Sequence, residues 1–392
     1  MAGVRRLVLP LVAVLLSGCT ALLSGCTATP PAPAAGDIPA PGTLLASEPL
    51  AAALSLPGAG RAFRFRYATT DVRGQPAVST AAAFLPPGTP PPDGWPVLAW
   101  AHGTVGLGDD CTPSAHPRGE RDAEYLDHWL AQGYAVVASD YTGLGTPGLM
   151  SYLSTTATAH AVVDSVRGLQ DLARAESVAL SPRWVVVGQS QGGAGAVATA
   201  RYATEFAADS GLDYRGAVAT GTPAFLEDLV AGAGPDLALP PGLGPIATAY
   251  SAYILAGFRD ARPDLDVDAT LSPAGRDAVD RAERLCTADL AASLDGVTPD
   301  ELFRAPLASV PGVRDALTAY LGIPVTGYDR PLFLGVGLRD RDVPPSSSLR
   351  LADALRAHGQ PVELHVYPDQ DHSGTVLASL GDSTPFLRRV LG

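Results

Sequence analysis

The sequence predicts an α/β fold in which helices cover both faces of a mostly parallel central sheet. Two observations support this prediction. From residue 96 onward, short apolar runs alternate with longer segments of helical character, and this alternation is typical of parallel sheets. One such run, 183–187, leads into a turn of small residues at 188–192 and then into a Gly/Ala-rich helical segment. Ligands of such folds bind beyond the carboxyl ends of the strands, so we expect the functional residues there.

The individual elements are expected in the following order. Two antiparallel strands come first, at 61–69 and 77–85, because polar and apolar residues alternate there on either side of a turn. Further strands are expected at 96–101, 135–139, 183–187, 214–221, 331–337 and 362–366, and helices near 121–132, 159–175, 192–205 and 346–358. The chain is long enough for a large core that carries an insertion.

The alternation stops between the expected strands at 214–221 and 331–337. Prolines, glycines and short helical pieces (247–258 and 275–286) replace it. We therefore expect a core formed by 56–222 and 327–392, with a helical cap inserted at 223–326. The apolar residues of this cap are candidates for lining an acyl pocket: Leu229, Leu237, Leu239, Ile246, Tyr250, Tyr253, Ile254 and Phe258. Alternatively, each of them only packs the cap onto the core.

Ser190 is the candidate nucleophile. It stands in Gly188-Gln-Ser-Gln-Gly192, between an expected strand and an expected helix. A serine at such a turn adopts a strained backbone, and small neighbours relieve the clashes that Cβ atoms would create. The turn lifts the hydroxyl above the sheet, next to backbone N–H groups at the helix start. The alternative is an ordinary Gly/Ser loop, because the chain contains 42 glycines.

An acid and a base follow Ser190 in the order that a hydrolytic triad needs. Asp340 and Asp342 both lie in the loop 338–344 after an expected strand, and the pattern Gly-x-x-Asp-x-x-Val-Pro favours Asp340. His372 lies in a turn-rich loop after the last expected strand, where an imidazole can exchange a proton with the serine. The order Ser, Asp, His is that of the α/β-hydrolases. The alternative reading makes the two aspartates solvated loop charges.

An oxyanion hole is expected from two backbone N–H groups. Thr104 follows the strand 96–101 within a His-Gly turn, and Gln191 follows the nucleophile. These are the positions that donate to the developing oxyanion in this fold. His102 is expected to be a structural residue of the turn.

Several motifs make the chain similar to the secretory lipase family. They are the segments 100–106, 110–114, 137–148 and 188–193. The resemblance runs from about Arg61 to the C-terminus, although 225–326 matches by position more than by motif. It implies an α/β-hydrolase core with a helical cap, an activity on carboxylic esters, and Ser190, Asp340 and His372 as the triad. Gln189 departs from the histidine or tyrosine that many hydrolases have there.

The leading functional hypothesis is a serine carboxylic-ester hydrolase, esterase or lipase, that works through an acyl-enzyme without a cofactor. A serine peptidase or amidase with the same triad is the first alternative, although no charged cluster beside the motifs is evident that would hold a peptide terminus. A lipoprotein that binds apolar ligands without catalysis is the second, but it would be expected to lose part of the triad.

Composition limits the partners. The net charge is −13 and the isoelectric point about 4.9, which argues against nucleic-acid binding. No zinc or haem motif is present. The expected partner is a small-molecule or lipid ester, and the sequence specifies neither its acyl length nor an oligomeric state.

The N-terminus predicts export. Residues 1–26 combine Arg5-Arg6 with an apolar stretch and two Leu-Ser-Gly-Cys motifs, which resemble a lipobox. Cys19 is the favoured acylation site and Cys26 the alternative, while simple cleavage would give a secreted protein. Residues 27–55 are expected to form a disordered Pro/Ala/Gly-rich tether, so a lipid anchor would be the only contact with the membrane.

Cys111 and Cys286 are the two cysteines of the sequence that lie outside the N-terminal signal segment. In an exported protein, two remaining cysteines more often form a disulfide than stay free. The resemblance to the secretory lipases supports this pairing, which would join the loop near the oxyanion strand to the cap. The alternative is two separate buried thiols.

Overall fold

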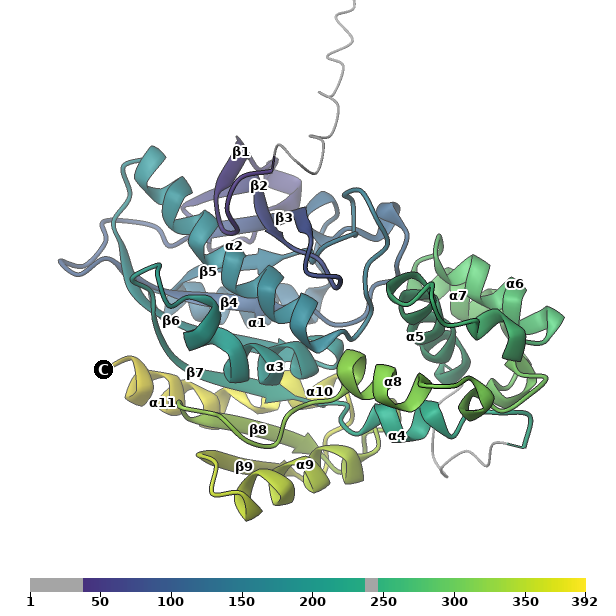
Figure 1. Ribbon diagram of the computed structural model, residues 1–392. Coiled ribbons are helices and arrows are strands. Elements are labelled where there is room, and N and C mark those ends of the chain that lie inside the picture. Colours follow the sequence, from purple (N-terminus) through teal and green to yellow (C-terminus); the bar gives the residue numbers. More distant parts are fainter. Residues whose placement is uncertain (1–37, 237–245) are drawn as a thin grey trace, which may run out of the picture. The chain divides into compact units, whose positions relative to one another are not determined.

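The structure is a computed structural model that describes residues 38–236 and 246–392. A single nine-stranded sheet forms the centre of this part of the chain (Figure 1). Its strands are β1 (Leu44–Pro49), β2 (Arg61–Thr70), β3 (Pro76–Leu85), β4 (Trp95–Ala101), β5 (Ala135–Ser139), β6 (Leu180–Gln189), β7 (Asp213–Thr220), β8 (Leu332–Gly337) and β9 (Val362–Tyr367). Their order across the sheet is β1-β2-β3-β5-β4-β6-β7-β8-β9. The pairs from β1 to β5 are antiparallel, and all later pairs are parallel. The predicted α/β-hydrolase fold is confirmed.

The central strands are buried on both faces, which explains why they read as continuous apolar runs. In β4, Val97 and Ala99 face one hydrophobic core, while Leu98 and Trp100 face another. This period of two gives each face of the sheet its own core.

Helices cover both faces. They are α1 (Glu120–Ala131), α2 (Thr155–Ala175), α3 (Gln191–Phe206), α9 (Pro345–Ala357), α10 (Gly374–Ala378) and α11 (Leu380–Leu391). Helices α2, α3 and α9 contribute to the first core, whereas α1, α10 and α11 contribute to the second. No helix in the described ranges is long and apolar enough to cross a membrane.

Between β7 and β8 the described residues form an insertion of helices. It contains α4 (Leu226–Ala231), α5 (Ala247–Ala261), α6 (Pro273–Ala282), α7 (Thr287–Ser293) and α8 (Val313–Leu321), with short 3-10 turns at Val267–Thr270, Pro299–Leu302 and Leu307–Ser309. These helices gather beside one end of the sheet (teal to light green in Figure 1). The insertion occupies the position expected for the cap.

The expected disordered tether, 27–55, includes residues that the structure shows to be ordered. Residues Leu44–Pro49 form the edge strand β1, in which Ser47 pairs with Phe65 of β2. Leu44 also donates its N–H to Asp171 of α2 at 3.2 Å. The prediction was wrong here because an edge strand with one exposed face has little apolar signal. The signal sequence, Cys19, Cys26 and residues 27–37 lie outside the described ranges.

The predicted disulfide Cys111–Cys286 is confirmed. It joins the loop after β4 to the start of α7, and the Thr287 N–H donates to Val105 O at 3.0 Å beside it. The two backbones pack closely there, because a Cβ on Gly108 would lie 2.1 Å from Arg284 O. The insertion is thus fastened to the loop that carries Thr104.

Candidate active site

Ser190 stands at the strained turn between β6 and α3. Its φ of 59° and ψ of −122° are unusual for a residue with a side chain. A Cβ on Gly188 would lie 2.0 Å from Gly192 O, and one on Gly192 would lie 1.8 Å from Ala101 O. Both glycines are therefore required for this turn, as the sequence pattern predicts.

Two backbone N–H groups lie beside Ser190 without an acceptor among the described residues. Gln191 is the first residue of α3, where an N–H has no partner within the helix. Thr104 lines the same cavity as Ser190, and its hydroxyl hydrogen-bonds Tyr152 Oη at 2.6 Å. This side-chain bond holds the loop on which the Thr104 N–H is carried.

Asp340 and His372 form a buried pair from two loops. His372 Nδ1 lies 2.6 Å from Asp340 Oδ2. The other carboxylate oxygen, Oδ1, accepts the N–H groups of Asp342 and Val343 at 2.9 and 2.8 Å. The structure thus brings Asp340 to the histidine, while the Asp342 side chain faces a neighbouring cavity. No hydrogen bond joins Ser190 Oγ to His372, although both side chains line one cavity among the described residues.

Two residues that the sequence analysis did not single out for this role support the pair. Gly221 follows β7 with a φ of +55°, and a Cβ there would lie 2.9 Å from the His372 ring. Gln189 donates its amide to His372 O at 3.4 Å, which ties the histidine loop to β6. Gln189 could have been noticed because many hydrolases have histidine or tyrosine at this position. Nothing in the sequence indicates the role of Gly221.

His102 is structural, as expected. Its ring is buried, and it stacks on Tyr141 with 4.2 Å between ring centroids. Burial lowers the pKa of His102, so the ring is neutral near pH 7. Asp140 is fully buried and accepts hydrogen bonds from Thr80 and Ser114. It fixes the loop after β4 to the sheet.

An apolar cavity of about 380 Å³ opens on one side of Ser190. Four of the eight cap residues proposed for an acyl pocket line it: Leu229, Ile246, Tyr250 and Ile254. Tyr253 and Phe258 pack in the core instead. Leu237 and Leu239 lie outside the described ranges.

A second, polar cavity of about 310 Å³ opens on the side of His372. Arg118 and Arg121 line it, just before and within the first turn of α1. The sequence analysis found no charged cluster that would hold a peptide terminus, and it did not identify these two arginines. The sequence hides this cluster because about 70 residues separate these arginines from Ser190.

The described residues contain no group of three or more His, Cys, Asp or Glu side chains that could hold a metal ion. The site consists of a serine, an imidazole–carboxylate pair and free N–H groups. These are the parts of a nucleophilic acyl-transfer site.

Comparison with protein families agrees with this geometry. The family described as secretory lipase matches residues 120–297, which include Ser190 and much of the insertion. This match confirms the predicted resemblance to the secretory lipase family.

Solved structures show the same fold at low sequence identity. Candida antarctica lipase A in its closed state superposes with a TM-score of 0.73 at 19% identity, over 90% of this chain and 82% of that one. The rice cell wall degrading esterase LipA from Xanthomonas oryzae gives 0.69 at 22% identity, over 90% and 98%. A hydrolase of Legionella pneumophila gives 0.72 at 18%, over 88% and 98%.

A second family also matches part of the chain. The prolyl oligopeptidase family matches residues 314–387, which carry β8, β9 and the loops of Asp340 and His372. No curated protein matches this chain. The match to a secretory family and the disulfide are both consistent with export.

Proposed function

We propose that this protein is an exported serine carboxylic-ester hydrolase with Ser190, Asp340 and His372 as its triad. One observation carries the proposal. The His372–Asp340 pair, at 2.6 Å, borders the same cavity as a serine held on a strained strand-to-helix turn. Such a constellation is recognised by its geometry and the role of each group.

The geometry supports one direction of proton transfer. Because Nδ1 of His372 faces Asp340, Nε2 is left to take the proton from Ser190 Oγ. The serine attacks the ester carbonyl, and the N–H groups of Thr104 and Gln191 stabilise the oxyanion. His372 then protonates the leaving alcohol, and water releases the acyl group by the same route.

The two cavities suit the two halves of an ester. The apolar cavity of about 380 Å³ suits an acyl chain, and we propose that the insertion acts as its cap. The polar cavity contains His372, the group that must reach the leaving oxygen. The alcohol half is therefore assigned to the polar side.

A serine peptidase is the second candidate, because the prolyl oligopeptidase family matches 314–387. This match covers the acid and base loops, which a hydrolase of this fold uses whether the bond is an ester or an amide. The apolar cavity beside Ser190 favours the ester.

The test is hydrolysis of 4-nitrophenyl esters from acetyl to palmitoyl, beside peptide 4-nitroanilides. We expect ester hydrolysis that falls at least a thousandfold in Ser190→Ala and in His372→Ala. His358→Ala, at the exposed end of α9, is the matched control and should retain activity. Faster cleavage of anilides than of esters would favour the peptidase, and no serine-dependent turnover of any substrate would overturn the proposal.

We further propose that Cys19 is acylated and anchors the enzyme at the cell surface. The support is the apolar stretch that runs into the first Leu-Ser-Gly-Cys motif. Mass spectrometry of the mature N-terminus in cells would show a diacylglyceryl-cysteine, lost in Cys19→Ser and kept in Cys26→Ser. The reverse pattern would assign Cys26, and an unmodified N-terminus would leave a secreted enzyme.

A further inference from the structure

The polar cavity carries more positive than negative charge. Arg118 and Arg121 line it, together with a single carboxylate, Asp122. Asp122 is already paired, since its Oδ1 accepts from Arg121 Nε at 2.8 Å. Arg121 also reaches Ser373 Oγ and Gln189 Oε1 at 3.3 and 3.4 Å, so it fastens α1 to the catalytic loops. Arg118 is the arginine of this cavity that no carboxylate contacts directly among the described residues, although the negative charges of Asp140 and Asp122 act on it at longer range.

Within the described ranges, Arg118 forms no ion pair, and two of its nitrogens have no hydrogen-bond partner. Nε and Nη2 are buried without an acceptor among the described residues, and the guanidinium lies over the Phe84 ring at 5.2 Å. The nearby carboxylate of Asp140 has both oxygens occupied by donors from Thr80 and Ser114. A cation taken out of water without a partner costs free energy, and an anion in the cavity would offset that cost.

This charge lies on the leaving-group side of Ser190. His372 lines the polar cavity and must protonate the departing oxygen, whereas the apolar cavity is lined by neither histidine nor Arg118. The protein as a whole has a net charge of −13, so its long-range field would repel an anion. A half-buried guanidinium with two buried nitrogens at this one place therefore indicates a local role.

We propose that the preferred substrates are esters whose alcohol half carries an anionic group, a carboxylate or a phosphate, and that this group pairs with Arg118. The inference rests on the proposed function and deepens it by naming the substrate class. A guanidinium forms charge-assisted hydrogen bonds with either anion, and these bonds strengthen away from bulk water.

The test compares two aryl esters that differ only in charge. They are 3-nitro-4-(octanoyloxy)benzoate and its neutral benzamide, both of which release a coloured phenol. We expect the intact enzyme to give a kcat/KM at least tenfold higher for the benzoate, and Arg118→Gln to reduce this ratio about tenfold. Arg118→Lys should keep part of the preference, because it keeps the charge but not the planar donors.

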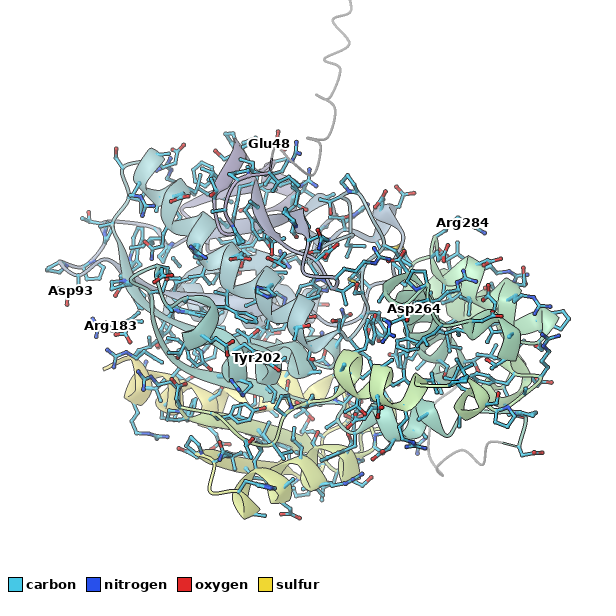
Figure 2. All side chains as sticks on the ribbon, viewed as in Figure 1. Glu48, Asp93, Arg183, Tyr202, Asp264 and Arg284 are labelled. Carbon is cyan, nitrogen blue, oxygen red and sulfur yellow. A yellow bond between two sulfur atoms is a disulfide. The ribbon has the colours of Figure 1, made fainter. Side chains whose placement is uncertain are left out.

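Arg284→Gln is the matched control. Arg284 is exposed and lies on the outer side of the insertion, away from the polar cavity (Figure 2). Its replacement removes the same charge from the protein and should leave the ratio unchanged. A ratio near one in the intact enzyme, or an equal ratio in Arg118→Gln, would overturn the inference.

Two further arms separate the remaining outcomes. The ratio of kcat/KM for 1-octanoylglycerol 3-phosphate to that for 1-octanoylglycerol measures the preference for a phosphate. If this ratio exceeds the benzoate-to-benzamide ratio, the preferred anion is a phosphate, and otherwise it is a carboxylate. If a thermal melt shows that Arg118→Gln does not fold, the ratios of kcat/KM measured for the intact enzyme and for Arg118→Lys decide between the outcomes.

A binding experiment tests the anion site without turnover. It compares the affinity of Ser190→Ala for 4-hydroxy-3-nitrobenzoate with its affinity for the corresponding benzamide. Equal binding refutes the anion site, while failure to hydrolyse every ester refutes only the proposed function.

Discussion

Replacing Gly221 by alanine adds one methyl group directly against the proposed catalytic histidine. Gly221 follows β7, and a Cβ at this position would lie 2.9 Å from both Cε1 and Nδ1 of His372 and 3.4 Å from Asp340 Oδ2. Since ordinary contacts of such atoms begin near 3.4 Å, the ring must move by about half an ångström. The His372–Asp340 bond of 2.6 Å would be disturbed by this movement.

Two effects of this change can be separated. The φ of +55° makes any side chain unfavourable, which costs about 1–2 kcal/mol of stability. Displacement of the imidazole affects the rate instead, and a misplacement of this order lowers kcat by roughly ten- to a hundredfold. The loss should fall on kcat more than on KM, because substrate binding does not depend on the histidine position.

The assay is ester hydrolysis by Gly221→Ala beside Gly211→Ala. Gly211 has a φ of +73°, and a methyl group added there would have nothing within 4 Å, so this variant shares the backbone strain without the contact. We expect both variants to melt earlier, but only Gly221→Ala to lose kcat. Equal kcat values in the two variants would refute the reasoning that Gly221 leaves room for the imidazole.

Three other outcomes follow from the same structure. Asp340→Asn should lower kcat by about 10⁴-fold and Asp342→Asn by no more than a few-fold; the opposite ranking in ester kinetics would reassign the acid. Replacing Cys111 and Cys286 together by serine opens a loop of 175 residues and should cost about 5 kcal/mol in urea unfolding, and an unchanged midpoint would contradict this. Burial raises the pKa of Asp164 from 3.8 to about 7, so its contribution to stability is full at low pH and is lost as the pH rises through 7. Asp164→Asn should flatten the unfolding free energy between pH 4.5 and 8, and an unaltered pH slope would disprove this role.

The sequence predicted the fold well wherever a local pattern determines the structure. The strand Ala135–Ser139 has the predicted bounds, because its buried apolar run ends at a sharp change in composition. The turn at Ser190 could also be predicted from the sequence, because its geometry restricts which residues can stand there. Only glycine fits at 188 and 192, so the sequence had to display the pattern.

The missed features depend on distant segments. Arg118 and Gln189 belong to the site because the fold brings separate stretches together, and Gln189 contacts a residue 183 positions away. Gly221 has no local signature, since its requirement comes from His372. Strand β1 was missed for another reason, as its four exposed residues mimic a polar linker.

The disulfide at Cys286 has a mechanical consequence for the insertion. A body attached to its support at two points can rotate about the line through them, and the insertion has two such points, after β7 and before β8. The bond to Cys111 adds a third attachment, and three points that do not share a line leave no free axis of rotation. Any movement of the insertion relative to the sheet therefore requires bending within the insertion, because it cannot rotate as one rigid body.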